Sequence, residues 1–391
     1  MKPEKPTIRP PAFLAAACLV LFASIGSAAA LVDDGSAPRA RIVKTRTIAP
    51  GLTYTKIVQK KIPRRTFILE LDLSEAITLD VTIADAALPS RDELTDIVRR
   101  ADALVGVNGD YGGLGDPVHP FAQDGELLQT TQALGTLFAV ARNESATFFD
   151  KPKVEITITD ATSGRVFTLD RWNDGGPMPG ELVGFSPLGG TLEPPPSFAC
   201  SARLLPAGPP RAADPDGVER DYTVDAVGCL EEPLTRNGGI VISAAPATDE
   251  ATELLTLATG TSMRLRWSFG WPNVFDAVGG APLLLRDGEP VGICNSGCGR
   301  QPRTGVGVTA TGTILLVVID GRQARWSLGP TVAEFADIMA ELGAINALNL
   351  DGGGSSEMVV EGEVVNRPSD GNERRISNAI LVLPGPDPDE P

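Results

Sequence analysis

The sequence contains few aromatic residues and almost no histidine. Only 5% of its 391 residues are aromatic, and His119 is the single histidine. A non-catalytic glycan-binding module would need a broad aromatic-rimmed groove, which so few aromatic residues do not favour. A Ser–His–Asp triad would have to use His119, and the Gly-x-Ser-x-Gly elbow of many serine hydrolases is absent. We therefore interpret His119 as a structural residue.

Cysteine is also scarce. The chain has five cysteines, and four remain outside the first 30 residues. An even number of cysteines in an exported protein predicts disulfides. The short spacing favours a Cys294–Cys298 pair, which leaves Cys200 to pair with Cys229. A zinc site is the rival interpretation, but one histidine and no Cys-x-x-Cys pair speak against it.

Positive charge is in deficit. Thirty-four lysines and arginines stand against 50 aspartates and glutamates, for a formal net charge of -16. A surface this acidic repels phosphate backbones, so we expect no nucleic-acid partner. A small phosphate-bearing ligand remains compatible with the sequence, because a few local arginines can outweigh the mean field.

Residues 1–30 have the pattern of an export signal. A positive start with Lys2, Lys5 and Arg9 precedes an apolar run, and small residues follow it. We predict an exported protein, whether periplasmic, extracellular or lumenal. The alternative is an uncleaved anchor over residues 11–32, which is just long enough to span a bilayer and would give the only membrane contact.

The rest of the chain predicts a strand-rich, mixed α/β fold with few helices. We expect a mobile leader at 31–50, a strand and helix lead-in at 51–101, one main domain at 102–385, and a disordered tail at 386–391. The Pro- and Gly-rich stretch 171–217 is interpreted as an irregular excursion of the main domain.

Two helices have start signals. Ser90 with Glu93, and Thr331 with Glu334, have the spacing of capping boxes, so we expect helices near 91–101 and 332–342. Apolar strands at 313–319 and 345–350 flank the second helix. Strand, helix and strand in about 40 residues predict a C-terminal βαβ unit with parallel strands.

Both strands of that unit end in an acidic turn. Asp320-Gly321-Arg322 follows the first strand, and Asp351 with Gly352–Gly354 and Ser355 follows the second. Parallel strands would bring both aspartates to the same edge, where such sheets bind ligands. Each Asp-Gly alone is typical of an ordinary turn, but three glycines exceed what a turn requires. We therefore expect a ligand-facing loop, whose backbone amides could approach an anion.

Other polar residues are less decisive by themselves. Asn108-Gly109 follows a short apolar strand and belongs either to the same edge or to a plain turn. Arg303-Thr304 precedes a strand. An arginine there can bind phosphate through two parallel hydrogen bonds, or form a surface ion pair. The loop 366–374 carries both charge signs and is either solvated or part of a site.

In combination, these segments resemble the phosphodiester glycosidase family. The matching motifs span about 104–384 and are Val107-Asn108-Gly109, Gly279-Gly280-Ala281-Pro282-Leu283, Pro302-Arg303-Thr304-Gly305-Val306-Gly307, Val318-Ile319-Asp320-Gly321-Arg322, Leu348-Asn349-Leu350 with Asp351 to Ser356, and Val365 with Asn366 to Arg374. The family usually has an aromatic pair where this chain has Asp110-Tyr111, and often proline where it has Arg375. These departures affect the expected substrate preference more than the chemistry.

The resemblance implies an exported hydrolase that cleaves the glycosidic bond of a sugar-1-phosphodiester and releases free sugar and a phosphomonoester. Asp351 and Asp320 are the unranked candidates for nucleophile or water-activating base, and Glu373 is a reserve acid. The expected phosphate ligands are Arg303 and the Gly352–Gly354 amides, with Arg374 as a second clamp. Asn108 and Ser355 would orient sugar hydroxyls or phosphate oxygens. Gly109, Thr304 and Arg322 complete the expected binding residues.

The expected partner is a sugar-phosphodiester or a cell-envelope glycan, and no cofactor is required. Two alternatives stay open. One is a metal-dependent phosphodiesterase, with Asp110, Asp320, Asp351 and Glu373 around Ca²⁺ or Mg²⁺. The other is a non-catalytic glycan-binding module of the cell envelope.

Overall fold

The computed structural model describes residues 40–60, 63–130, 135–141, 147–190, 199–213, 215–229, 237–291, 294 and 297–385. The predicted signal or anchor at 1–30 and the predicted tail at 386–391 lie outside these residues. Within the described ranges, none of the helices has both the length and the apolar character needed to cross a bilayer.

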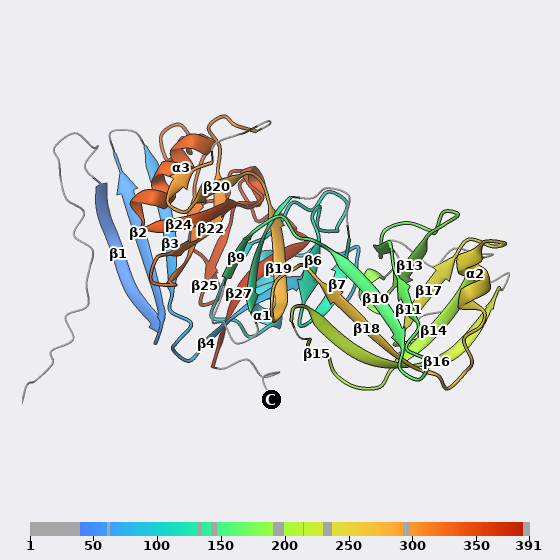
Figure 1. The fold of residues 1–391 in the computed structure, drawn as a ribbon. Helices are drawn as coiled ribbons and strands as arrows, with labels where there is room; N and C mark the ends of the chain where they lie inside the picture. Colours follow the sequence, from blue (N-terminus) through green and yellow to red (C-terminus); the bar gives the residue numbers. More distant parts are fainter. Residues whose placement is uncertain are drawn as a thin grey trace, which may run out of the picture. The chain divides into compact units, whose positions relative to one another are not determined.

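An eight-stranded sheet supports the candidate site (Figure 1). Its order is β1 (Ala40–Ala49), β2 (Leu52–Gln59), β3 (Arg64–Leu71), β23 (Ile314–Ile319), β22 (Arg303–Thr309), β24 (Ala344–Asn349), β20 (Leu283–Arg286) and β21 (Glu289–Pro290). Strand β23 is apolar along its whole length because both of its faces are buried. Leu316 and Val318 face one core, and Leu315 and Val317 face another.

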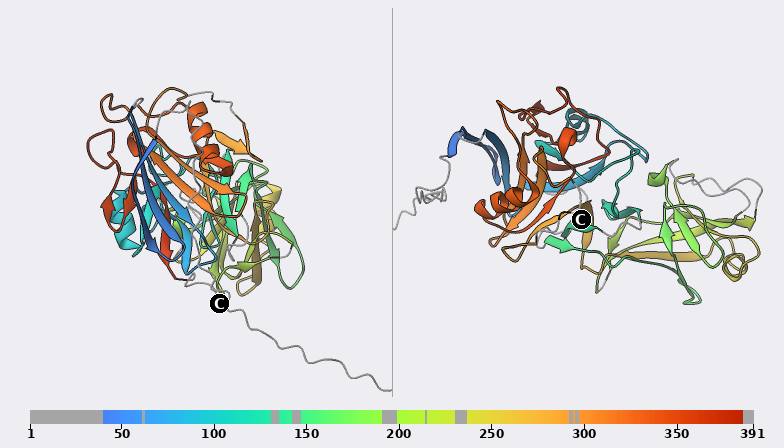
Figure 2. Two further views of the ribbon diagram at one scale, coloured as in Figure 1. Left: turned by 90° about the vertical axis from the view of Figure 1, so that its left-hand side faces the viewer. Right: turned by 90° about the horizontal axis from the view of Figure 1, so that it is seen from above.

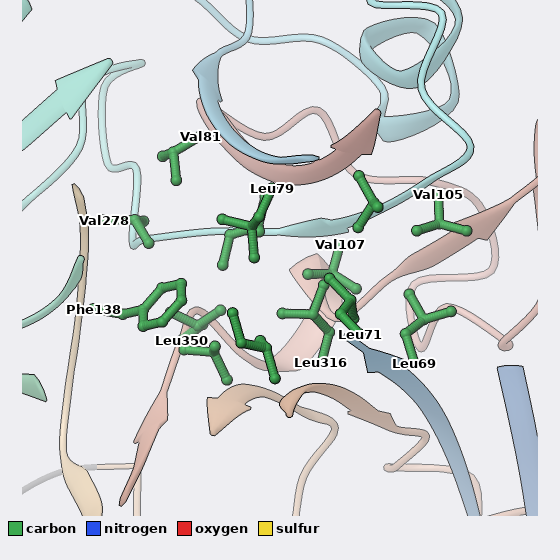
Figure 3. Packing of buried hydrophobic residues seen from close by; sticks show 14 of the residues in the cluster. Leu69, Leu71, Leu79, Val81, Val105, Val107, Phe138, Val278, Leu316 and Leu350 are labelled. Carbon is green, nitrogen blue, oxygen red and sulfur yellow. The ribbon is translucent and has the colours of Figure 1, made fainter. Parts of the chain in front are cut away.

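The first of these cores lies between the eight-stranded sheet and two five-stranded sheets. One has the order β26 (Glu363–Val364), β25 (Met358–Val360), β5 (Val105–Asn108), β27 (Asn378–Pro384) and β4 (Ile77–Ile83). The other is β7 (Glu126–Gln129), β6 (Phe121–Gln123), β19 (Val274–Gly280), β8 (Thr136–Ala141) and β9 (Thr147–Asp150). Leu69, Val107 and Phe138 represent the three sheets in this core (Figure 3).

Helices cover the outer faces of two sheets. Helix α3 (Val332–Glu341) lies on the eight-stranded sheet (Figure 2). It packs there through Phe335 and Met339. Helix α1 (Leu94–Arg100) packs on the sheet that contains β5. A Cβ at Gly106 of β5 would come 2.7 Å from Val98 of α1, so glycine permits this close approach. The site region is therefore built from two helix-covered sheets packed face to face.

The predicted strand–helix–strand unit is confirmed, with one strand inserted. Strands β23 and β24 both run antiparallel to β22, which lies between them, so they are parallel to each other without being neighbours. Their carboxyl ends therefore reach the same edge, on either side of the start of β22. The mixed, strand-rich fold predicted from the sequence is confirmed.

The excursion predicted at 171–217 is more ordered than expected. It contains β12 (Arg171–Trp172), β13 (Leu182–Phe185), the 3₁₀ turn η1 (Pro187–Gly189), β14 (Cys200–Pro206) and β15 (Arg211–Ala212). These strands join β11 (Val166–Thr168), β10 (Glu155–Asp160), β18 (Ser262–Ser268), β16 (Val218–Cys229) and β17 (Ile240–Ala244) in a nine-stranded sheet with its own core. Strand pairing distant in sequence organises this stretch despite its prolines.

Residues 40–49 correct the prediction of a mobile leader over 31–50. They form β1, which pairs antiparallel with β2 from Ala49↔Leu52 to Ala40↔Gln59. Gly51, at φ +77°, makes the tight turn between the two strands. Residues 31–39 of the predicted leader lie outside the described residues.

The helix start signals had different outcomes. Thr331 and Glu334 form the predicted capping box of α3. The predicted Ser90–Glu93 box is wrong, because α1 has Glu93 at its N-cap and that side chain makes no capping hydrogen bond. A short helix, α2 (Asp249–Leu254), was not predicted and is capped by the Thr248 hydroxyl.

The two predicted cysteine pairs lie at disulfide distance. Cys200 and Cys229 join the neighbouring strands β14 and β16, with an S–S distance of 2.00 Å. Cys294 and Cys298 are 2.16 Å apart at sulfur. Both pairs agree with the prediction, which rested on the short Cys294–Cys298 spacing and the two cysteines that remained.

Glu357 is a buried carboxyl without a hydrogen-bond partner among the described residues. It directly precedes β25, is 1% exposed, and neither of its carboxylate oxygens is bonded. Burial, together with the nearby charges of Glu373 and Glu93, raises the pKa of Glu357 to about 8. The side chain is therefore held in its protonated form at neutral pH.

This burial predicts a pH-dependent loss of stability. Below the ordinary glutamate pKa of 4.5, the folded and unfolded states both hold the proton; between 4.5 and about 8 only the folded state keeps it. The free energy of unfolding should then fall as pH rises, by up to about 1.4 kcal/mol per pH unit. Urea unfolding at about pH 5 and about pH 7.5 should show a smaller loss in Glu357→Gln than in the wild type. Equal losses in the two proteins would contradict the assignment.

Candidate active site

Asn108 connects three segments at the common edge of the strands. Its Nδ2 donates to the backbone oxygen of Asp351 at 2.8 Å, and its Oδ1 accepts from the Thr304 hydroxyl at 2.7 Å and from the Glu357 amide at 3.1 Å. The Asp351 amide in turn donates to the Gly109 carbonyl at 3.0 Å. Asn108 and Thr304 are buried. Asn108 and Thr304, both predicted to bind substrate, set the position of the Asp351 loop, and Asn108 also lines the second cavity.

Two adjoining cavities open at this edge, and both are lined by Asp351 and Arg374. The first cavity, of about 520 Å³, is also lined by Tyr111, His119, Ala281, Pro282, Cys294, Gly297, Gln301, Arg303, Arg322, Gly352, Gly353 and Gly354. The second cavity, of about 400 Å³, is also lined by Arg91, Asn108, Asp110, Gly112, Gly113, Ser355, Arg375, Ile376 and Ser377. A ligand centred on Asp351 can therefore extend into both cavities.

The Asp351 carboxyl lies at the junction of the cavities. Burial raises its pKa, whereas a hydrogen bond from the Ser355 side chain and one from the Gly352 amide, at 2.8 Å, lower it. Arg374 also lowers the pKa of Asp351, and the nearby Asp110 charge raises it. Asp351 thus combines access to a cavity with an environment that resists ionisation, as in many catalytic carboxyls.

The glycine loop differs from the predicted anion cradle. The Gly352 amide donates to Asp351, and the Gly353 amide donates to the Pro302 carbonyl at 3.0 Å. Gly353 has φ +64°, and a Cβ there would approach the Arg322 guanidinium within 2.9 Å. The glycines therefore let arginine side chains approach the loop, and two of the three predicted amide donors are already used by the protein.

Three predicted arginines line the first cavity. Arg303 is 3% exposed, and its Nη2 donates to the carbonyls of Gly297 and Gly299 at 2.6 and 2.8 Å. Its buried Nε has no partner among the described residues, and burial lowers its pKa. Arg322 donates to the Gln301 side chain at 3.0 Å. Arg374 forms an ion pair with Asp370.

Asp320 does not line either cavity. Its Oδ2 accepts from the Trp326 indole at 2.6 Å, and its Oδ1 accepts from the Arg367 amide at 2.9 Å and the Asn366 side chain at 3.2 Å. The side chain is 1% exposed, and this burial raises its pKa while the hydrogen bonds lower it. The direction of β23 places Asp320 at the predicted edge of the sheet. Its carboxylate, however, accepts hydrogen bonds from Trp326 and from the Arg367 loop and so connects these two segments.

Glu373 also makes a structural contact. Its Oε2 accepts from the Thr95 amide at 3.1 Å, and its Oε1 accepts from the Thr95 hydroxyl at 2.9 Å. Glu373 thus caps the first turn of α1, where a negative charge is favourable. It lines neither cavity, in contrast to Arg374, the next residue.

The four acidic residues of the metal-dependent alternative are not gathered around one point. Asp320 and Glu373 have the partners described above, and Asp110 is bonded to His119. Among the described residues, the one group of three carboxyls with ligand atoms close enough for an ion is Asp80, Asp124 and Asp276. That group lines neither cavity.

His119, which the sequence interpretation assigned to structure, lines the first cavity. Its Nδ1 lies 2.7 Å from Asp110 Oδ1, and its backbone amide donates to Asp110 Oδ2 at 2.8 Å. Glycines at 135 and 279 leave room for its ring, because a Cβ at either would collide with it. The sequence offered one signal for this arrangement. Asp110, the hydrogen-bond partner of His119, stands where the family usually has an aromatic residue.

Comparison with known proteins identifies a family segment. Residues 220–383 match the family model described as phosphodiester glycosidase. The SPbeta prophage-derived protein YomE of Bacillus subtilis is 40% identical over 83 residues, which are 21% of this chain and 13% of that protein. N-acetylglucosamine-1-phosphodiester alpha-N-acetylglucosaminidase of Bos taurus is 33% identical over 87 residues, 20% of this chain and 16% of that protein. The chain thus spans less than a fifth of either relative.

A solved structure shows the same fold more broadly. A hypothetical protein from Synechocystis superposes with a TM-score of 0.64 at 22% identity, covering 89% of this chain and 64% of that one. The matched segment 220–383 contains Arg303, Asp351 and Arg374, whereas Asn108 and His119 precede it. The resemblance to the phosphodiester glycosidase family that the motifs predict is therefore confirmed over residues 220–383.

Proposed function

We propose that this chain is a hydrolase that cleaves the glycosidic bond of a sugar-1-phosphodiester and releases free sugar and a phosphomonoester. The observation that carries the proposal is the position of Asp351, a half-buried carboxyl at the junction of two arginine-lined cavities. The family of residues 220–383 supports a glycosidase-type reaction. The substrate is a sugar-phosphodiester, free or within a cell-envelope glycan.

The leaving group determines what the residues must do. A phosphate monoester has a second pKa of about 6, so it departs at neutral pH with little help from a general acid. Arg303 and Arg322 line the first cavity and suit the phosphate, since guanidinium groups bind its oxygens in pairs. Asp351 is then left to face the sugar carbon, as nucleophile or as base for the attacking water.

Asp351 is the preferred reacting carboxylate for a geometric reason. A group that meets substrate must have an oxygen directed at the substrate space. Asp351 lines both cavities, while the oxygens of Asp320 are bonded to Trp326 and the Arg367 loop. We therefore propose Asp351 over Asp320, and Arg374, which lines both cavities, as the neighbouring clamp.

We further propose export as the route by which the protein reaches its substrate. The two cysteine pairs at bonding distance are compatible with an oxidising compartment. Residues 1–30 supply the proposed signal, and retention of residues 11–32 would give the one membrane attachment. No nucleic acid and no obligatory metal cofactor enter the proposed reaction.

Replacement of Asp351 tests the reacting group. Asp351→Asn keeps the side-chain shape but removes the negative charge, so kcat should fall by about a hundredfold or more. Asp96→Asn, on the exposed side of α1, is the matched control and should keep wild-type activity. A panel of sugar-1-phosphodiesters provides substrates, and circular dichroism checks the fold. Unchanged turnover in Asp351→Asn would reject the assignment.

The position of bond cleavage tests the reaction class. Hydrolysis in ¹⁸O-labelled water should place the label in the free sugar, because water attacks the sugar carbon. Label in the phosphate would show P–O cleavage, as expected of the alternative phosphodiesterase. Mass spectrometry of both products distinguishes the two outcomes.

The acid side of the pH–rate profile tests the environment of Asp351. Activity requires its ionised form, and burial raises its pKa, so activity should be lost at a pH above the ordinary aspartate range as the solution is acidified. Ser355→Ala removes a hydrogen bond that lowers this pKa, so it should move the acid limb to higher pH. Ser356→Ala removes a buried hydroxyl without a partner among the described residues and is the control. If Ser355→Ala left the acid limb of the pH–rate profile in place, the proposed role of Asp351 would be contradicted.

A further inference from the structure

Three arginines line the second cavity. They are Arg91 and the consecutive residues Arg374 and Arg375. Arg91 donates one hydrogen bond to the Gly112 carbonyl at 3.2 Å, and Arg375 donates one to the Arg91 carbonyl at 2.6 Å. Neither forms an ion pair with a carboxylate among the described residues. A guanidinium has five N–H donors, so both side chains keep donors for a ligand.

This cavity gathers three arginines in a chain that is acidic overall. The sequence carries a formal charge of -16, and most of the ion-paired arginines among the described residues line neither cavity. The carboxylates that line the second cavity are Asp110, which is bonded to His119, and Asp351. Arg374 is paired with Asp370, so Arg91 and Arg375 are the arginines of this cavity without a carboxylate partner among the described residues. Two such guanidinium groups side by side favour a bound anion.

The cavity continues the proposed site on the sugar side. Arg303 and Arg322 line only the first cavity, which we assigned to the phosphate. A sugar whose anomeric carbon lies at Asp351 must then extend from the phosphate into the second cavity. The volume of about 400 Å³ is within the range of small-molecule sites, and Asn108, Ser355 and Ser377 offer polar groups there.

We propose that the second cavity binds an anionic substituent on the sugar, so that the substrate is the 1-phosphodiester of a sugar bearing a phosphate or a carboxylate. This inference rests on the proposed function, because it takes Asp351 as the position of the anomeric carbon. Arg91 and Arg375 bind the second anion, and Arg374 lies between the two cavities. Arg375 stands where the family pattern often has proline, so the preference belongs to this chain in particular.

Binding of sugar phosphates tests the inference without turnover. The probes are glucose 1-phosphate, glucose 1,6-bisphosphate and glucuronic acid 1-phosphate, with the mannose 1-phosphate and 1,6-bisphosphate pair as a second sugar. Titration calorimetry with the full chain should show at least about tenfold tighter binding when the sugar carries the second anion, as expected for added charge-assisted hydrogen bonds. The phosphate and carboxylate probes distinguish the two forms of that anion.

Arginine variants test which residues cause the preference for the second anion. The double variant Arg91→Gln with Arg375→Gln should bind glucose 1-phosphate as the wild type does and should lose the preference for the second anion. Arg99→Gln removes an exposed arginine of α1 and should keep the preference. The subsite would be rejected if the wild type showed no preference for the second anion with either sugar. It would also be rejected if that preference survived in the double variant.

Failure of the subsite and failure of the proposed function give different results. Labelled sugar in ¹⁸O water together with equal binding of mono- and bisphosphates would reject the subsite alone. Labelled phosphate together with a preference that depends on Arg91 and Arg375 would reject the glycosidase reaction and retain an anion site in the second cavity.

Discussion

The carboxamide of Asn108 is the interaction on which the site depends. It sits at the end of β5 and is bonded to the Asp351 loop, to Thr304 at the start of β22, and to the residue before β25. An asparagine offers a donor and an acceptor in fixed directions, and here all of these contacts are made in a buried environment where unmade bonds are costly. These contacts hold two packed sheets in one relative position at the edge where the cavities open.

Several elements were predictable because their causes are local. The capping box of α3, the two cysteine pairs and the apolar strands around α3 follow from residues close together in sequence or from a simple count. The insertion of β22 between β23 and β24 was not predictable, since it arises from pairing between segments that the sequence order does not connect. The strand β1 was missed for a different reason, because its partner β2 is the next strand and Gly51 makes the turn between them.

Prediction of the site from the sequence was limited mainly because the sequence does not show which way a side chain points. Asp320 and Asp351 follow strands of equal direction and look alike in sequence, yet Trp326 and the Arg367 loop take up the oxygens of Asp320. Glu373 and Arg374 are neighbours, but one caps α1 and the other lines the cavities. Some of these choices depend on partners far away in sequence, such as Arg367 for Asp320 and Thr95 for Glu373.

The Cys294–Cys298 pair has a consequence for when the site becomes complete. Gly297 lies within the small ring that this pair closes, and its carbonyl accepts from Arg303. Before the sulfurs are joined, that ring is an open segment, and the acceptor has more conformations available to it. The orientation of a buried arginine is thus coupled to thiol oxidation. Reduction of the pair would therefore loosen one of the two backbone carbonyls that orient Arg303 in the wall of the first cavity.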